Sequence, residues 1–337
     1  MNRATSKPAS VRRRRVIGIS AAAGGLALLP LAPPGTTRAA PLLRVWRGVA
    51  LGADAVLQVH HPDPAVADRL IEAGLAEVER LERVLSLYRQ ESALARLNRD
   101  GQLAEPPPDL LRLLGEAASY SRLTAGAFDL TVQPLWDVYA AHFAQPGADP
   151  AGPPAEALAA AVARVGHDRV EADPALVRFT RPGMAITPNG IGQGYVTDRV
   201  VELLRRGGIE HALVDMGETR AIGAYPDGGS WRIGLEDPAA PGQAAETIPL
   251  ADRAVATSGG YGTLFDPAGR FNHIFEPQTG RTSWRYRAVS VIAPTATMAD
   301  ALSTAFCVMP LDQTRAVAAR LGIAVHLALP DGSRLVQ

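Results

Sequence analysis

The stretch NGIGQGYVTD, residues 189–198, decides between two fold classes, because three glycines at alternate positions precede an apolar run of helical spacing. Glycine lets backbone N–H groups approach an anion, and a helix start adds a favourable dipole, so the stretch could bind phosphate. A dinucleotide-binding loop also needs a hydrophobic strand directly before it and an acidic residue closing the next strand. Here the segment ITPNG precedes the loop, and Pro188 is unfavourable in a central strand. Taken alone, the stretch is better interpreted as a turn that begins a helix.

On both sides of this turn, candidate strands and helices interleave without regular strand–helix–strand units. Apolar residues recur at helical spacing after Asp63-Pro64, which is a typical helix start. The order predicts an α+β fold of mixed sheets with packed helices, in one large domain or two intimately joined halves. Helices are expected at 64–85, 109–123, 194–206 and from about 299, and strands at 52–61, 212–215, 230–235, 288–293 and on both sides of Asn272.

The charge of the chain is unevenly distributed. The whole chain has 34 basic and 34 acidic residues, but residues 1–40 hold seven basic side chains and no acidic one. The rest of the chain is therefore acidic, with 27 basic residues against 34 acidic ones. An acidic body argues against a nucleic-acid-binding surface.

The basic excess at the start predicts an export signal over residues 1–40. Arg12–Arg15 precede an apolar run at 16–32, and TTRAA at 36–40 supplies small residues for cleavage. The stretch SVRRRRVIG resembles a twin-arginine signal, while an ordinary Sec signal or an uncleaved anchor are the alternatives. We therefore expect a periplasmic or otherwise exported protein, retained at the inner membrane if the signal is uncleaved. The mature chain, residues 41–337, is not expected to span a membrane.

Two further segments have residue types suited to ligand binding. In TAGAFDLTVQPLW, Gly126 and Ala127 predict a tight turn, Phe128 offers a ring face and Asp129 is an acceptor, so together they could hold a heteroaromatic ligand. Alternatively, Asp129 caps the turn and Phe128 belongs to the core. In FNHIFEPQTGRTS, His273 lies in a strand-like run, where a lone histidine is more often bonded to backbone than catalytic.

The segment ATMADALSTA carries a possible ion site. Asp300 and Thr304 are four residues apart, so on a helix they share one face. A carboxylate and a hydroxyl presented together suit an oxygen-preferring ion such as Mg²⁺. The alternative is that Asp300 only favours the helix dipole. The single cysteine, Cys307, has no internal disulfide partner and is expected to be a small buried apolar residue.

The order of these motifs along residues 47–309 resembles the ApbE family, the FAD-dependent FMN transferases that flavinylate other proteins. The resemblance implies an α+β fold with FAD in a cleft between two halves and Mg²⁺ at the flavin pyrophosphate. It is carried by SLYRQESALARLN, TAGAFDLTVQPL, GIGQGYVTDRVVELL, ALVDMGETRAIG, ATSGGYG, HIFEPQTG and ADALSTA.

The resemblance implies a role for each matching position. His273 is the candidate base and Asp300 a metal ligand rather than a base, and both are assigned to the catalytic set. The expected metal ligands are Gly190, through its carbonyl, Asp300 and Thr304. The expected FAD contacts are Leu51, Tyr88, Ala127, Phe128, Asp129, Thr187, Gln193, His273 and Ile274.

The implied reaction is attack of a Ser or Thr hydroxyl of a partner protein on the FMN-side phosphorus of FAD, with release of AMP. The expected acceptor is a flavoprotein subunit of a membrane electron-transfer system. Many relatives have Asp at Thr187, Lys at Gln193 and Asp at Glu276, and two adjacent glycines where VDMGETRAIG has one. Two other activities therefore stay open: an FAD carrier without transferase activity, and a Mg²⁺-dependent FAD hydrolase that yields FMN and AMP.

Overall fold

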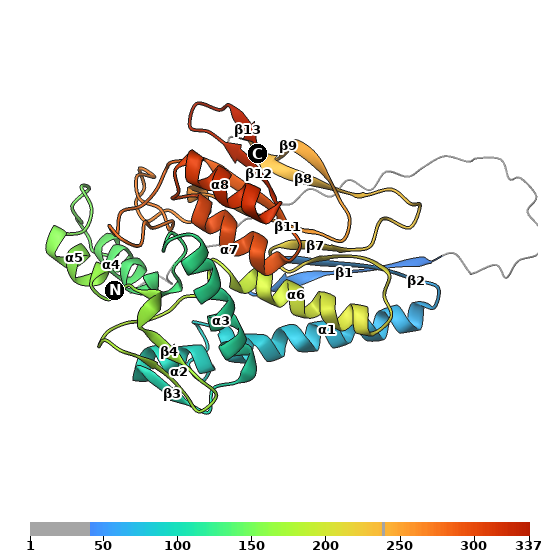
Figure 1. The fold of residues 1–337 in the computed structure, drawn as a ribbon, viewed down its shortest axis with the longest axis horizontal. Helices are drawn as coiled ribbons and strands as arrows, with labels where there is room; N and C mark the ends of the chain where they lie inside the picture. Colours follow the sequence, from blue (N-terminus) through green and yellow to red (C-terminus); the bar gives the residue numbers. More distant parts are fainter. Residues whose placement is uncertain (1–40, 238–239) are drawn as a thin grey trace, which may run out of the picture.

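The computed structural model describes residues 41–237 and 240–337, and the predicted export signal at 1–40 lies outside them (Figure 1). Its centre is a sheet of eight strands in the order β1-β2-β6-β7-β10-β11-β12-β13. Neighbouring strands pair antiparallel throughout the described part of this sheet, and the α+β class is confirmed. The strands are Leu42–Ala50, Ala53–His61, His211–Asp215, Thr219–Ile222, Ala254–Ser258, Ala288–Ala293, Ala324–Ala328 and Arg334–Val336.

Helices α1, α6 and α7 form a layer that packs against one face of the sheet (Figure 1). Helix α1 starts as its sequence indicates, because the Asp63 carboxylate accepts a hydrogen bond from the Ala65 N–H at 2.8 Å and Pro64 fits the first turn. Its apolar stripe is buried in the main core, so the predicted bounds are confirmed. The layer and the helix that follows it are α1 Pro64–Leu85, α6 Gly192–Arg206, α7 Ala296–Phe306 and α8 Leu311–Leu321.

The opposite face of the sheet packs against a hairpin of β8, Trp231–Asp237, and β9, Ala240–Leu250. Side chains alternate across a strand, so in β6 Val214 belongs to the main core and Leu213 to a second core beneath the hairpin. Trp231 and Ile248 bring the hairpin's side chains into that second core.

A third unit lies at one end of the helix layer, in green in Figure 1. Leu135 and Tyr139 of α4 form its own small core with Phe275. Its elements are α2 Ala93–Asp100, α3 Pro108–Leu123, α4 Gln133–Phe143, α5 Ala155–Val162, a sheet of β3 Gln102–Ala104, β5 Leu176–Phe179 and β4 Val170–Ala172, and the 3-10 helices η1 Leu130–Val132 and η2 His167–Arg169. A last 3-10 helix, η3 Gly260–Gly262, follows β10.

The prediction of strands on both sides of Asn272 is wrong. This segment forms only two isolated bridges, Leu264 with Asn272 and Phe275 with Thr282. The fully buried Asn272 side chain accepts a hydrogen bond from the Ile274 N–H at 2.8 Å and donates one to the Ser283 carbonyl at 2.8 Å. These bonds replace strand pairing. Of the apolar residues that suggested strands, Phe271 and Phe275 pack in the third core and Ile274 packs in the main core.

The described chain contains no helix that is both long enough and apolar enough to cross a membrane.

His60 of β2 is expected to make the fold sensitive to acid. It is buried beside Trp231, with 5.8 Å between ring centroids, and burial lowers the pKa of its imidazole. Folding therefore disfavours the protonated imidazole. Above pH about 6.5 His60 is neutral in both the folded and the unfolded chain and does not reduce the free energy of unfolding, which declines as the pH falls below this value. We expect His60→Gln to lose less thermal stability than the wild type between pH 7.5 and pH 5. His61→Gln in the same strand is the control, and equal acid sensitivity of His60→Gln and the wild type would contradict the prediction.

Candidate functional site

Helices α6 and α7 approach so closely at Gly194 that no side chain fits there. The Gly194 N–H donates a hydrogen bond to the Asp300 carboxylate at 3.0 Å. A Cβ at Gly194 would lie 2.3 Å from the Ala296 carbonyl oxygen and 2.8 Å from the Asp300 Cβ. The last glycine of NGIGQGYVTD is therefore required by helix packing, and the interpretation of this stretch as a turn into a helix is correct.

The three predicted metal ligands meet beside this contact. A Cβ at Gly190 would lie 3.0 Å from the Thr304 hydroxyl oxygen, so the Gly190 backbone lies against Thr304. The Thr304 hydroxyl is 3.2 Å from the Ser258 hydroxyl at the end of β10. Asp300, one turn before Thr304, is 3% exposed. The structure thus brings together a carboxylate, a hydroxyl and a glycine backbone from distant parts of the chain.

This set of oxygen donors fits a hard cation. Mg²⁺ usually takes one or two carboxylates from the protein and completes its shell with water and substrate phosphates. Within the described residues, no group of three or more His, Cys, Asp and Glu side chains could hold a metal ion. A site with one carboxylate, Asp300, is therefore suited to an ion that a phosphorylated ligand helps to hold.

A cavity of about 260 Å³ has Asn189, the neighbour of Gly190, in its lining together with three predicted FAD contacts, Leu51, Tyr88 and Gln193. Tyr88 is 84% exposed, so its ring is accessible to a ligand. A second cavity of about 360 Å³ shares part of this lining and also contacts Trp136. Sequence reasoning missed Trp136, although it ends the motif TAGAFDLTVQPLW. The other residues of the first cavity are Gly52, Glu82, Leu85, Ser86, Leu87, Arg89, Pro188, Asn189, Gly192 and Val196.

Gln193 and Thr187 are held by the backbone around them. The Gln193 amide packs over Gly217, where φ is +101° and a Cβ would lie 2.5 Å from Gln193 Nε2. Gly217, the glycine of the MGE segment, therefore makes room for Gln193. Thr187 is buried, and its hydroxyl accepts a hydrogen bond from the Asn189 N–H at 3.2 Å. This bond fixes the turn that leads to Gly190.

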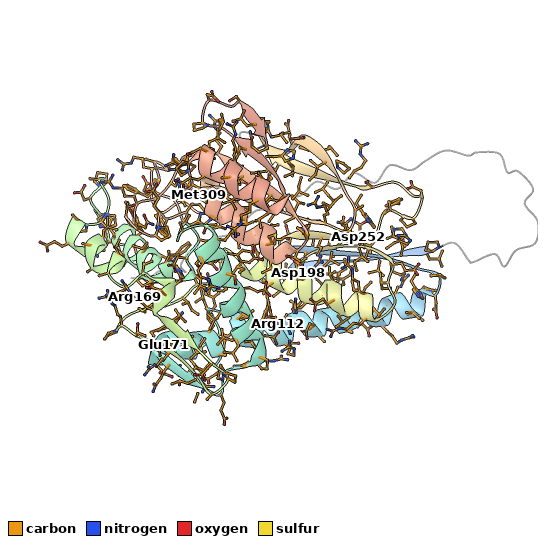
Figure 2. The ribbon with its side chains drawn as sticks, viewed as in Figure 1. Arg112, Arg169, Glu171, Asp198, Asp252 and Met309 are labelled. Carbon is orange, nitrogen blue, oxygen red and sulfur yellow. The ribbon has the colours of Figure 1, made fainter. Side chains whose placement is uncertain are left out.

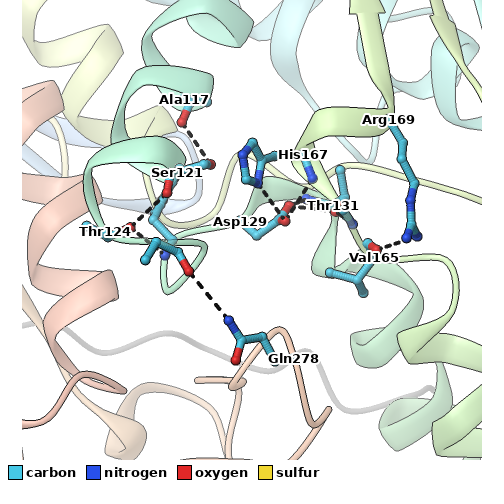
Figure 3. Close-up of polar contacts among 12 residues, drawn as sticks. Ala117, Ser121, Thr124, Asp129, Thr131, Val165, His167, Arg169 and Gln278 are labelled. Atoms are coloured by element: carbon cyan, nitrogen blue, oxygen red, sulfur yellow. Dashed lines mark hydrogen bonds and ion pairs between the residues drawn. The ribbon is translucent and has the colours of Figure 1, made fainter.

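The side chains of Phe128 and Asp129 serve the core and the turn, and Figure 3 shows the polar contacts of Asp129. Phe128 is 3% exposed and belongs to the main core. The Asp129 carboxylate accepts hydrogen bonds from the Thr131 N–H at 2.8 Å and the His167 N–H at 2.9 Å, and its bond to the imidazole raises the pKa of His167. Ala127 lines a third cavity, of about 360 Å³. This third cavity shares no lining residue with the first two, and contact of the segment with FAD stays a prediction.

His273 lies outside any strand, contrary to the strand-like run expected for it. Its Nδ1 is 3.2 Å from the Thr263 carbonyl oxygen, which can only accept, so the proton belongs on Nδ1 and Nε2 is the basic nitrogen. A Cβ at Gly262 would lie 3.0 Å from His273 Cε1. The short segment from Ser258 to Gly262 therefore links the surroundings of Thr304 to those of His273. Ile274 is 5% exposed and packs in the main core.

Asp198, the last residue of NGIGQGYVTD, holds the start of α7 in place and was not predicted to do so. Its buried carboxylate accepts hydrogen bonds from the N–H groups of Ala296 and Thr297, each at 2.9 Å, and pairs with Arg220. Figure 2 labels Asp198 where α6 and α7 meet. A carboxylate at a helix N-terminus satisfies otherwise unbonded N–H groups and favours the helix dipole. Asp198 thus fixes the helix that carries Asp300.

Comparison with known proteins gives consistent matches. The model of the ApbE family matches residues 51–327. A Haemophilus influenzae protein named FAD:protein FMN transferase is 32% identical over 271 residues, covering 77% of each chain. A Vibrio cholerae protein of the same name is 33% identical over 266 residues, covering 76% of this chain and 78% of the relative. The solved structure of the flavin transferase ApbE from Vibrio cholerae matches with a TM-score of 0.75 at 28% identity, covering 88% of this chain and 97% of that one. The apo form of the Pseudomonas stutzeri flavinyl transferase ApbE matches with a TM-score of 0.74 at 29% identity, covering 88% and 94%.

Proposed function

The chain belongs to the ApbE family, and from this premise we propose that it is an FAD:protein FMN transferase. In this reaction a Ser or Thr hydroxyl of an acceptor protein attacks the FMN-side phosphorus of FAD. The new phosphoester bond joins FMN to the acceptor, and the bond to AMP breaks. The observation that carries the proposal is the meeting of Gly190, Asp300 and Thr304 beside the cavity lined by Leu51, Tyr88 and Gln193.

In this proposal, residues of the chain bind and orient FAD and the metal ion and deprotonate the hydroxyl of the acceptor. Gly190, Asp300 and Thr304 would hold Mg²⁺, which supplies neutralisation of the charge that develops on the phosphate oxygens during phosphoryl transfer. His273, with its proton on Nδ1 toward the Thr263 carbonyl, can accept the hydroxyl proton at Nε2. The cavity around Leu51 and Tyr88 would bind FAD through apolar and aromatic contacts.

One assay separates the transferase from the two alternatives. The mature protein is incubated with FAD, Mg²⁺ and a flavoprotein acceptor domain, and both AMP and covalent flavin are measured. AMP together with flavin on the acceptor supports the proposal. AMP with free FMN indicates a hydrolase, and bound but intact FAD indicates a carrier.

The proposed place of action rests on the start of the sequence, and the proposed acceptor rests on the family resemblance. The twin-arginine-like segment at residues 1–40 supports export to the periplasm, with the mature chain carrying out transfer there. The acceptor in this proposal is an exported-side flavin domain of a membrane electron-transfer protein. Fractionation of cells that express the full chain, with detection of the cleaved product, tests the location. A product that stays in the cytoplasm would contradict it.

Gln193→Lys is expected to strengthen FAD binding. Gln193 lines the cavity, and a lysine there adds a positive charge near the phosphates of the ligand where glutamine offers only a hydrogen bond. We expect affinity to rise about threefold to tenfold at low ionic strength and to approach the wild-type value as salt is added. FAD titration at two salt concentrations measures this. Gln133→Lys in the second cavity is the matched control, and an equal gain there would show a general charge effect instead.

A further inference from the structure

Glu82 joins two separate segments of the cavity lining. It lies in the last turn of α1, and one carboxylate oxygen accepts a hydrogen bond from the Leu51 N–H at 3.1 Å. The other oxygen accepts a hydrogen bond from the Arg89 guanidinium at 2.7 Å. Leu51 and Arg89 both line the cavity, so one side chain spans the β1–β2 turn and the segment after α1.

The turn that Glu82 contacts has an unfavourable residue in it. Residues 51 and 52 form a two-residue loop between the paired residues Ala50 and Ala53, with φ of +52° at Leu51 and +74° at Gly52. Such a turn favours Asn or Gly at its first position, because other side chains are strained at positive φ. A strained residue of this kind persists only where its surroundings fix it, and it is often found at ligand sites. The bond to Glu82 is a contact that fixes Leu51.

The choice of leucine places an apolar side chain at the cavity. Leu51 is half-buried, packs against the main core and lines the cavity, whereas an asparagine would fit the turn without strain but would offer a polar side chain. Leucine therefore makes the turn less stable than asparagine would, but it places an apolar side chain where a ligand can contact it.

We propose that Glu82 is a positioning residue that fixes the Leu51–Gly52 turn against the ligand, so that FAD affinity depends on it. The proposal rests on the function proposed above. Glu82 does not contact the reacting phosphate in this role, so it acts on binding and not on the rate of chemistry. In this proposal, FAD affinity depends mainly on the carboxylate oxygen of Glu82 that accepts the hydrogen bond from the Leu51 N–H. The ion pair with Arg89 contributes less, because both partners are partly exposed.

Three variants of the mature protein test the proposal by FAD titration, steady-state kinetics and thermal unfolding. Glu82→Ala removes both contacts and is expected to weaken FAD binding about fivefold to tenfold, because the hydrogen bond that orders the Leu51–Gly52 turn is lost. The value of kcat is expected to change less than about twofold. Glu82→Gln keeps an acceptor for the Leu51 N–H and is expected to stay within about twofold of wild-type affinity. Arg89→Ala removes the ion pair together with a guanidinium that lines the cavity, keeps the Glu82 acceptor for the Leu51 N–H, and is expected to weaken binding less than Glu82→Ala does.

A fourth variant tests the strained turn independently. Leu51→Asn is expected to unfold at the wild-type temperature or higher and to bind FAD about as weakly as Glu82→Ala. Glu82→Ala and Arg89→Ala with equal losses would overturn the proposal, as would a Glu82→Ala variant that loses kcat while its affinity is unchanged. The binding readout needs no turnover, so a wild type that binds FAD without transferring FMN contradicts the transferase and still tests Glu82. A wild type that does not bind FAD overturns both.

Discussion

Asp300→Asn is expected to reduce FAD-dependent AMP release in Mg²⁺ by about a hundredfold to a thousandfold while the protein stays folded. The carboxylate is the one acidic member of the predicted metal set, and electrostatic stabilisation of a phosphoryl-transfer transition state depends on the ion it would hold. Asparagine has the same shape and keeps an oxygen acceptor for the Gly194 N–H, which the carboxylate bonds at 3.0 Å. The loss should therefore be in turnover rather than in stability.

Asp300→Ala is the companion variant, since it removes both the ligand and the bond to Gly194. We expect no measurable Mg²⁺-dependent turnover and some loss of thermal stability. Thr304→Val is the control for the second ligand, and a smaller loss is expected because a hydroxyl contributes less charge than a carboxylate. AMP release at several Mg²⁺ concentrations, with thermal unfolding in parallel, measures these effects. Unchanged turnover of Asp300→Asn would remove Asp300 from the metal site.

Asp198→Ala is expected to destabilise the fold by about 3–5 kcal/mol, the usual cost of removing one partner of a buried ion pair. The substitution leaves the buried Arg220 without this carboxylate and removes the acceptor of the Ala296 and Thr297 N–H groups. Chemical denaturation of the mature protein measures the loss.

The control for this prediction is Asp68→Ala, which breaks the exposed ion pair with Arg44. It is expected to cost much less than Asp198→Ala, because solvent screens an exposed pair. An equally small loss for Asp198→Ala would show that Asp198 does not hold the start of α7. Where Asp198→Ala remains folded, Mg²⁺-dependent turnover should fall too, because α7 carries Asp300.

Local patterns explain what could be predicted from the sequence. Helix α1 has a start signal in Asp63-Pro64 and an apolar stripe, so its bounds needed no tertiary information. Asp300 and Thr304 share a face because four residues make about one helical turn. These signals lie within a few residues of the positions that they determine.

The rest depends on specific side-chain hydrogen bonds, which the spacing of apolar residues does not encode. Asn272 replaces strand pairing with side-chain bonds to Ile274 and Ser283, so an apolar run that resembled strands became irregular. The buried acceptor role of Asp198 and the link from Glu82 to Leu51 join segments 98 and 31 residues apart. No periodicity could have indicated either of them.

The origin of the site residues along the chain limits when a ligand can bind during synthesis. The cavity and the proposed ion site combine Leu51 near the start of the described chain, Gly190 in its middle, and Asp300 and Thr304 near its end. A ribosome that has made the first 280 residues has produced Leu51 and Gly190 but neither Asp300 nor Thr304, so the proposed ion site would be incomplete. If these residues hold the ion, loading of FAD with it would follow synthesis of nearly the whole polypeptide, and a protein shortened before α7 would have no complete site to load.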